Sequence, residues 1–187
     1  MTPLRACDTV ITTKRTVLKP LSSSDAAALF AYRSLPEVYR FQTWVPRSLD
    51  DARAFILRYS VHPPMEESDW RQLGIYCRTS KALIGDCGFR ILEQREAEIG
   101  YTVAPSHQRQ GLGTEVVRGL VNYLFQERQL ERVIARTDVG NVGSITILEQ
   151  TGFRRQAPHT MTLQTGGELE GDSVFSIQRG RWTAQAR

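Results

Sequence analysis

The segment from Val103 to Thr114 combines residue types that can bind a phosphate. Gly111 and Gly113 stand one residue apart, where a strand-like run ends and a long helical pattern begins. The first N–H groups of a helix lack partners within the helix and lie at the positive end of its dipole, so they attract anions. Glycine lets the backbone approach a phosphate closely, and Arg109 adds a formal charge. We expect an anion site here, although a glycine-rich turn that only caps the helix would show the same pattern.

Two common phosphate-binding motifs do not match this turn. A P-loop requires Lys followed by Ser or Thr directly after its glycines. The dinucleotide fingerprint requires a third glycine and an acidic residue at the end of the next parallel strand. The sequence has neither arrangement, so this turn represents a different kind of phosphate site.

The elements that must position this turn follow from hydrophobic periodicity. Strand patterns cover residues 10–20, 71–78, 83–92, 97–103, 132–137, 160–163 and 173–179. Helical patterns cover residues 26–30, 37–41, 49–57, 111–127 and 144–151. Gly152 suits a left-handed helix C-cap, Lys81 a turn, and Gly166-Gly167 a connection between two paired strands. We expect the last residues, 180–187, to form a frayed tail.

This order predicts an α/β fold in which helices lie on the faces of a mixed sheet. The chain has 187 residues, of which 41% are hydrophobic and 24% charged, values that are typical of a globular protein. We find no linker between two halves. The sequence therefore predicts one domain over residues 1–187, with a core over about residues 10–180.

Composition also argues against several classes of protein. No stretch approaches the ~20 apolar residues of a membrane span, and the first residues lack a secretory signal, so we expect a cytoplasmic protein without a membrane partner. The net charge of +4 comes from scattered residues rather than a basic stripe, which argues against a nucleic-acid partner. Cys7, Cys77 and Cys87 have no metal-ligand spacing, so we expect no metal, and we interpret Cys77 and Cys87 as small buried residues.

Four segments together resemble one family. They are Thr13 to Leu21, the strand Ala97-Glu98-Ile99-Gly100-Tyr101, the turn Gln108-Arg109-Gln110-Gly111-Leu112-Gly113, and Asn141-Val142-Gly143-Ser144 followed by Leu148-Glu149 and Gly152-Phe153. They resemble the GNAT superfamily of N-acetyltransferases, and the first segment is similar to its ribosomal-protein N-terminal acetyltransferase branch. The four lie in the family's order and span most of the chain.

The resemblance implies a fold and a co-substrate. The fold would be a single GNAT-like domain with a largely antiparallel sheet that splays at the cofactor site, with helices on both faces. The co-substrate would be acetyl-coenzyme A, with the pyrophosphate held by the turn and the pantetheine arm paired with the strand before it. The residues implied in binding are Tyr101, Thr102, Val103, Gln108, Arg109, Gln110, Gly111, Leu112, Gly113, Thr114 and Asn141. The strand over 133–137 would be the parallel neighbour that diverges.

The chemistry of direct acetyl transfer requires that the amine lose a proton. Our first candidate for the base is Glu98, because several relatives carry a catalytic glutamate in the corresponding strand. A water relay, or an ion pair between Glu98 and a nearby arginine, is the alternative. Glu93 and Glu96 in the preceding turn are weaker candidates. A backbone N–H from Val103 or its neighbour would stabilise the oxyanion.

The departing thiolate requires a hydrogen-bond donor or an acid. Many family members use a tyrosine at the position that Leu148 occupies here, so this sequence lacks that group. Ser144 is then the candidate, although a serine near a helix start can instead cap the helix. His107 and His159 are weaker candidates for a proton shuttle, and Cys87 has no visible base beside it.

These observations predict an acetyl-CoA-dependent N-acetyltransferase that acts on a primary amine, for which a protein N-terminal α-amine is one option. A small-molecule amine such as an aminoglycoside or a polyamine is an alternative acceptor, since Glu66, Glu67 and Asp69 could face a polycation. A non-catalytic acetyl-CoA sensor is a further alternative. We expect a monomer or a homodimer, with acceptor contacts from residues 39–47 and 62–70.

Overall fold

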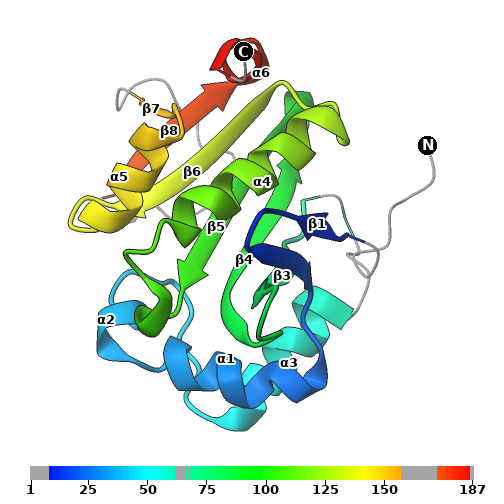
Figure 1. Cartoon of the computed structure of the whole chain (residues 1–187), viewed down its shortest axis with the longest axis vertical. Coiled ribbons are helices and arrows are strands. Elements are labelled where there is room, and N and C mark those ends of the chain that lie inside the picture. Colours follow the sequence, from blue (N-terminus) through cyan, green and yellow to red (C-terminus); the bar gives the residue numbers. More distant parts are fainter. Residues whose placement is uncertain (1–8, 62–65, 67, 157–171, 186–187) are drawn as a thin grey trace.

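The computed structural model describes residues 9–61, 66, 68–156 and 172–185 (Figure 1). The strands are β1 (Ile11–Thr12), β2 (Thr16–Pro20), β3 (Arg71–Cys77), β4 (Leu83–Leu92), β5 (Glu96–Val103), β6 (Arg132–Asp138), β7 (Arg154–Arg155) and β8 (Asp172–Gln178). The α-helices are α1 (Ala26–Arg33), α2 (Pro36–Tyr39), α3 (Leu49–Ile56), α4 (Leu112–Gln126), α5 (Val142–Gln150) and α6 (Arg179–Gln185). Short 3-10 turns cover Ser23–Asp25, Glu93–Arg95 and Pro105–His107, and a π-helical turn, η3, covers Leu57–Val61.

The described strands form one sheet in the order β1-β2-β3-β4-β5-β6-β8-β7. Every neighbouring pair of described strands is antiparallel except β5 and β6, which are parallel. The connection between these two strands is the turn followed by α4, which crosses one face of the sheet (Figure 1). The fold is therefore the mixed, largely antiparallel α/β arrangement that the sequence predicts.

The parallel pair separates partway along β5. Pairing of β5 with β6 ends where Ile99 lies opposite Ala135. Beyond that point β5 pairs only with β4, as far as Val103 opposite Gly85, while β6 pairs only with β8. Figure 1 shows the two strands diverging toward the end where α4 begins. The expected splay of the sheet is confirmed.

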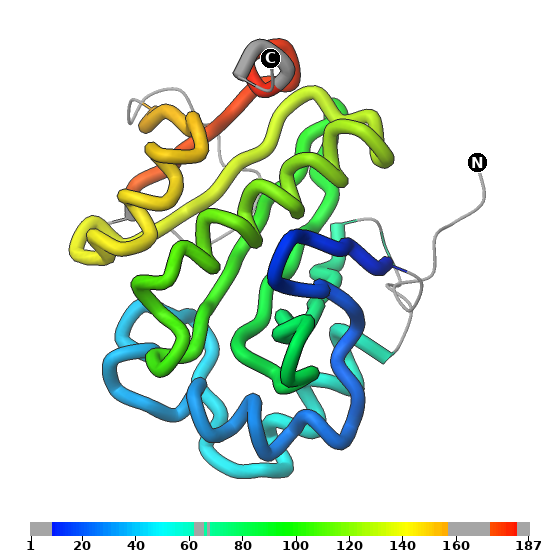
Figure 2. Tube along the Cα trace, in the orientation of Figure 1, coloured from blue at the N-terminus to red at the C-terminus, as the bar shows by residue number. Residues whose placement is uncertain are grey.

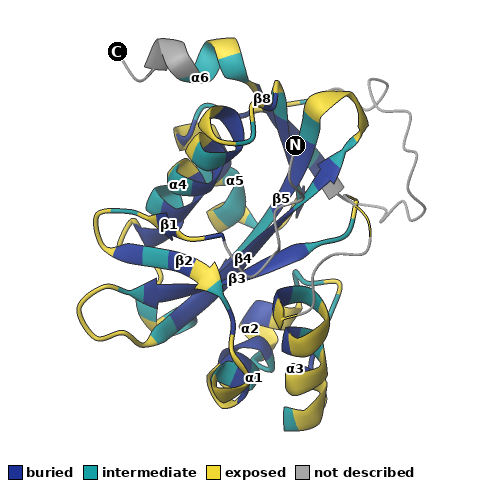
Figure 3. Cartoon of the chain, turned by 90° about the vertical axis from the view of Figure 1, so that its right-hand side faces the viewer, coloured by how far each residue is buried: buried dark blue, intermediate teal, exposed yellow. Residues whose placement is uncertain are grey.

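The apolar core lies between the sheet and α4. Side chains alternate between the two faces of a strand, so Phe89 on β4, Ile99 on β5 and Val133 on β6 point to the same side. The residues of α4 that cover them recur at helical spacing and are fully buried: Val116, Val117, Leu120, Val121, Leu124 and Phe125. Figure 2 traces α4 across the sheet, and Figure 3 shows the buried strands beneath it.

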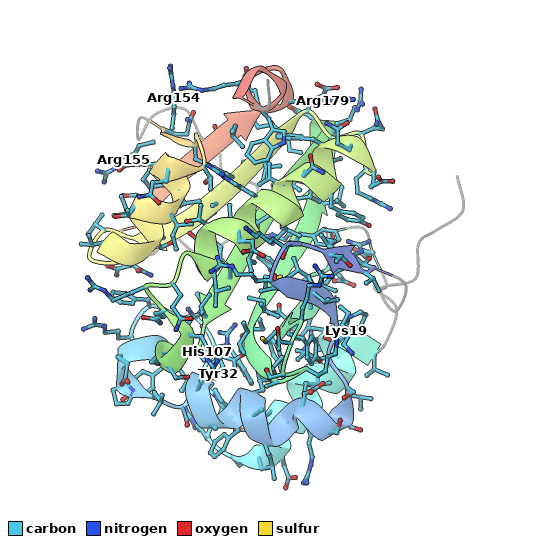
Figure 4. All side chains as sticks on the ribbon, in the orientation of Figure 1. Lys19, Tyr32, His107, Arg154, Arg155 and Arg179 are labelled. Atoms are coloured by element: carbon cyan, nitrogen blue, oxygen red, sulfur yellow. The ribbon has the colours of Figure 1, made fainter. Side chains whose placement is uncertain are left out.

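The opposite face carries a buried polar cluster that joins α1 to β4. Asp86 is fully buried and accepts hydrogen bonds from Tyr32 Oη at 2.5 Å, from Arg33 Nε at 3.0 Å and from Arg33 Nη2 at 2.5 Å. Gln72 on β3 donates to the same carboxylate. Burial raises the pKa of Tyr32, and the Asp86 charge raises it further, so the phenol stays protonated. Tyr32 therefore links α1 to the sheet (Figure 4).

Several boundaries differ from those expected from the sequence. The first strand is broken into β1 and β2, because Thr13 N donates to Thr16 O and forms a tight turn. The expectation of a frayed tail after residue 180 is wrong, since α6 continues to Gln185 and the Trp182 ring packs 6.3 Å from that of Phe125. The expected strand over 160–163 lies outside the described residues. Its expected partner, β8, pairs with β6 and β7.

Three further expectations concern the cysteines, membrane-spanning helices and metal ligands. Cys87 is fully buried as expected, whereas Cys77, at the end of β3, is partly exposed. Within the described ranges, no helix is both long and apolar enough to cross a bilayer. The same part of the chain holds no cluster of three His, Cys, Asp or Glu residues suited to a metal ion.

Replacing Asp86 with alanine should lower the free energy of unfolding by about 3–5 kcal/mol, because it leaves the buried Arg33 without its partner. Urea unfolding followed by circular dichroism would measure this change. Asp50→Ala is the matched control, since the ion pair of Asp50 with Arg53 is exposed and screened by water. Equal stabilities of the two variants would contradict a structural role for the Asp86 cluster.

Candidate active site

The turn between β5 and α4 has the backbone geometry of an anion site. Gly111 is the N-cap of α4 in the left-handed region, with φ of 73°, and Arg109 is also left-handed with φ of 59°. Within the described chain no side chain caps this helix start, so the first N–H groups of α4 point outward unpaired. A left-handed arginine is uncommon, and such strain is often found at binding sites. The turn therefore fits a pyrophosphate.

An arginine from the N-terminal hairpin supports the turn. Arg15 Nη1 donates to Gln110 O at 2.8 Å, and Arg15 Nε lies 2.7 Å from Glu115 Oε2. Thr13 Oγ1 donates to the same carboxylate at 2.6 Å. Burial raises the pKa of Glu115, but the hydrogen bonds from Thr13 and Arg15 outweigh it and hold the pKa below its ordinary value. Sequence reasoning missed this arginine because it lies about a hundred residues from the turn.

The two glycines of the turn have different roles. Gly111 is required by its left-handed backbone. At Gly113, an added Cβ would lie 2.7 Å from Ile147 Cδ1, so this glycine permits α4 to pack against α5. Gln108 does not project freely either, since its side-chain amide donates to Val103 O at 2.9 Å and fastens the turn to β5.

A basic hollow lies beside the turn. It has a volume of about 480 Å³ and is lined by residues that include Lys14, Arg15, Arg78, Lys81 and His107. His107, labelled in Figure 4, also hydrogen bonds through Nδ1 to Ser106 Oγ at 2.9 Å. The hollow adds positive charge next to the start of α4. His159 lies outside the described residues.

The free edge of β5 leads away from the turn. Ala104 N donates to Ile84 O at 2.9 Å on the β4 side. Because N–H groups alternate in direction along a strand, those of Val103 and Tyr101 point to the side from which β6 has diverged. A linear amide chain can pair with such an edge as an added strand does. The splay thus fits a pantetheine arm, with the N–H of Val103 next to the turn and that of Tyr101 closer to the point where β6 separates.

Two hydroxyl groups meet across the splay. Tyr101 Oη lies 3.0 Å from Ser144 Oγ and donates to Ser144 O at 3.2 Å. Burial raises the pKa of Tyr101 to about 12, while the Ser144 hydrogen bond opposes that rise, so the phenol remains a proton donor at neutral pH. Leu148 is fully buried in the core. Tyr101 on β5 therefore places a phenol beside Ser144 on α5. Sequence reasoning considered only the backbone of Tyr101.

Asn141, and not Ser144, caps α5. Asn141 is the N-cap, and its Oδ1 accepts a hydrogen bond from Ser144 N at 3.1 Å. Ser144 lies in the first turn of the helix, with its hydroxyl directed to Tyr101. The alternative that Ser144 serves as a helix cap is therefore wrong.

Glu98 lies on the opposite face from Tyr101, between two arginines. Only 6% of the residue is exposed. Its Oε2 accepts hydrogen bonds from Arg90 Nε at 3.0 Å and Nη2 at 2.6 Å. Arg136 Nε lies 3.2 Å from Oε1 but makes no hydrogen bond to it. Oε1 is therefore the carboxylate oxygen that can accept a further hydrogen bond.

The two weaker candidates for the base, Glu93 and Glu96, do not join Glu98. Glu96 pairs with Arg132 at 3.1 Å, and Glu93 is exposed in the turn before β5. Residues 62–70 are only partly described, but Trp70 reaches the site: an added Cβ at Gly100 would lie 3.7 Å from Trp70 Cη2. Arg154 and Arg155 on β7 are exposed (Figure 4), and Arg155 Nη2 donates to Ser173 Oγ on β8 at 2.5 Å.

Comparison with known proteins agrees with this geometry. The family model described as "Acetyltransferase (GNAT) domain" matches residues 15–154. An N-acetyltransferase of Bacillus subtilis, YoaA, is 31% identical over 175 residues, covering 92% of this chain and 98% of the relative. A ribosomal-protein-serine acetyltransferase of Escherichia coli is 33% identical over 73 residues, covering 38% of this chain and 41% of that protein.

A solved structure shares the fold. Mycobacterium smegmatis RimJ in complex with CoA-disulfide superimposes with a TM-score of 0.72 at 20% identity, covering 98% of this chain and 97% of the other. The chain belongs to the GNAT acetyltransferase family and is an acyltransferase. Its relatives include ribosomal-protein acetyltransferases, as the opening segment predicts.

Replacing Gly111 with valine should weaken acetyl-CoA binding at least about tenfold, because valine disfavours the left-handed backbone that directs the N–H groups. Isothermal titration calorimetry would measure the affinity. Gly111→Asn is the control, since asparagine tolerates this conformation and should retain most of the affinity. Unchanged binding by a folded valine variant would remove the anion-site interpretation.

Replacing Ser144 with alanine should slow the chemical step about 10- to 100-fold, because a hydrogen bond to a developing thiolate is worth ~1.5–3 kcal/mol. Tyr101→Phe should show a loss in the same range. Acetyl-CoA affinity should hardly change for either variant. Single-turnover kinetics and calorimetry would separate the two quantities.

Asn141→Ala provides the stability reference for that experiment, because it removes the cap and should cost ~0.5–2 kcal/mol. Ser144→Ala should keep a higher melting temperature than Asn141→Ala. A serine variant that loses stability but keeps full activity at low temperature would rule out the proposed role of the hydroxyl.

Proposed function

We propose that this protein transfers the acetyl group of acetyl-CoA directly to the α-amine of a protein or peptide. The observation that supports this most strongly is the free edge of β5 leading to the uncapped start of α4. That arrangement offers N–H groups for a linear amide arm along β5 and for a pyrophosphate at the turn that follows it. The relatives named for ribosomal proteins favour a protein acceptor.

In this proposal the turn and the open edge of β5 bind different parts of acetyl-CoA. The turn over Gln108 to Thr114 binds the pyrophosphate through backbone N–H groups, with Arg109 and Arg15 supplying charge. The edge from Tyr101 to Val103 pairs with the pantetheine arm, and Asn141 contacts it from the other side. Bound acetyl-CoA supplies a thioester whose carbonyl carbon is the electrophile. The N–H groups of Tyr101 and Val103 face the splay, and one of them would stabilise the negative charge on that carbonyl oxygen.

The groups that assist the reaction in this proposal lie on both faces of β5. The amine nitrogen forms a bond to the acetyl carbon while the carbon–sulfur bond breaks. The amine proton leaves to Glu98 Oε1, directly or through a water molecule. On the other face, the hydroxyl of Ser144, backed by Tyr101, donates a hydrogen bond to the departing sulfur. The reaction needs no further reactant.

The small-molecule alternative fits less well. A polycationic amine requires free carboxylates near the acceptor site. Asp86 and Glu98 are the buried acids of that face, and each is already paired with arginine. The non-catalytic alternative gives no role to the hydrogen-bonded pair of Ser144 and Tyr101. A protein or peptide α-amine is therefore the acceptor we favour.

Glu98→Gln should lower kcat/KM by about 100-fold or more at neutral pH, the usual scale for a positioned base. The loss should shrink as the pH rises, because a larger share of the α-amine, whose pKa is ~8, is then already unprotonated. Rates measured from pH 6 to 9.5 would test this. Parallel profiles for the two proteins would indicate a relay through water that does not involve Glu98.

A screen of acceptors would test the proposed function as a whole. Free thiol release from acetyl-CoA should depend on an added amine and should be fastest with peptides that have a free N-terminus. Aminoglycosides and polyamines serve as comparison acceptors. Tight acetyl-CoA binding without amine-dependent release would support the sensor alternative.

A further inference from the structure

Two buried polar atoms without a hydrogen-bond partner belong to the residues that follow the separation of β5 from β6. Among the described residues, Thr102 Oγ1 and Arg136 Nε are the buried side-chain polar atoms without a hydrogen-bond partner. Thr102 is on β5 and Arg136 on β6, and both follow the point where the two strands stop pairing. Most buried polar groups in proteins are hydrogen bonded. A bound molecule with a hydrogen-bond acceptor beside Glu98 would supply the partner that Arg136 Nε lacks.

The register shows which face these residues share. Gly100 would be the next partner of Arg136 if pairing continued beyond Ile99 and Ala135. Glu98, Gly100 and Thr102 alternate with core residues along β5, so all three occupy the face opposite α4. Gly88 lies next to Gly100 on β4. Neither glycine has a side chain, and the side chains that lie over them are those of Gln72 at Gly88 and Trp70 at Gly100.

Two side chains at the edge of this surface, Glu98 and Arg136, offer a hydrogen-bond acceptor and a donor side by side. Glu98 Oε1 can accept a hydrogen bond, because Arg90 occupies only Oε2. Arg136 lies beside that oxygen with an Nε that donates to nothing described. Trp70 forms an apolar wall against Gly100. A ligand that donates and accepts at adjacent atoms would satisfy both side chains.

We propose that Arg136 and Glu98 together recognise the aminoacyl end of the acceptor, an inference that rests on the proposed function. The α-amine donates to Glu98 Oε1, and the carbonyl one carbon away accepts from the Arg136 guanidinium. An isolated amine, such as a lysine side chain or a polyamine, has no carbonyl at that position. Arg136 is thus a specificity-determining residue that selects α-amines next to a carbonyl.

Charge on this face supports the same choice. The guanidinium groups of Arg33, Arg90 and Arg136 stand against the carboxylates of Asp86 and Glu98. The face therefore carries excess positive charge and disfavours an acceptor with several amines. A peptide N-terminus brings one amine together with a carbonyl dipole whose negative end suits a guanidinium.

The test compares two acceptors of similar shape, alanine amide and sec-butylamine, in which an ethyl group replaces the amide. The measured quantity is kcat/KM for thiol release, expressed per unprotonated amine. The wild-type protein should prefer alanine amide. Arg136→Gln should reduce this preference by about 10- to 100-fold, the range expected for a hydrogen bond from a charged group.

Arg132→Gln is the matched control. Arg132 lies on the same strand, four residues before Arg136, and pairs with Glu96 away from the splay. Its replacement should leave the acceptor preference unchanged. Calorimetry with acetyl-CoA and thermal unfolding would verify that each variant is folded. If Arg136→Gln does not fold, Arg136→Lys keeps the charge without the planar donors and should still lower the preference.

The outcomes separate the two proposals. An unchanged preference in a folded Arg136 variant, or an equal loss with Arg132→Gln, would overturn the role of Arg136 and leave the acetyltransferase function standing. Absence of amine-dependent thiol release by the wild-type protein, with these acceptors and with peptides, would overturn the proposed function and this inference with it.

Discussion

The divergence of β5 and β6 after one short parallel ladder is the constraint on which the site depends. Parallel strands joined by a helix normally bury their shared edge, and here that edge is left open over the last residues of β5. The N–H groups of Tyr101 and Val103 are open because β6 stops pairing with β5 after Ala135. The same divergence brings the start of α4 beside the open edge. One departure from regular pairing therefore opens the edge that we propose binds the cofactor.

The two faces of β5 divide the chemistry between them. Tyr101 faces α5 and meets Ser144, whereas Glu98 and Thr102 face the side of α1 and Trp70. Strand alternation alone produces this separation. Groups proposed to assist the sulfur thus lie apart from groups proposed to receive the amine. A carboxylate beside the sulfur would oppose thiolate formation, and the fold keeps the carboxylate of Glu98 on the far side of the strand.

Sequence reasoning predicted the features that local patterns encode. The apolar stripe of α4 and the glycine turn before it are encoded locally, and the family resemblance added the splay. The Asn141-x-x-Ser144 spacing also carried an N-cap signal that could have been recognised. An ion pair between Glu98 and an arginine was one alternative from the sequence, and Arg90 and Arg136 form it. Which arginines lie beside Glu98 and Asp86 could not be predicted, because they come from β4, β6 and α1. Tyr101 was missed as a side chain for the same reason.

The contacts of Thr13 and Arg15 with Glu115 make the first hairpin part of the proposed phosphate site. Glu115 lies in the first turn of α4, where an uncompensated carboxylate would repel a phosphate. A shortened chain that begins after residue 15 would keep every residue of the glycine turn and still leave that charge exposed beside it. The functional unit must therefore include Arg15, which neutralises Glu115. A shortened protein made for expression should begin before this residue.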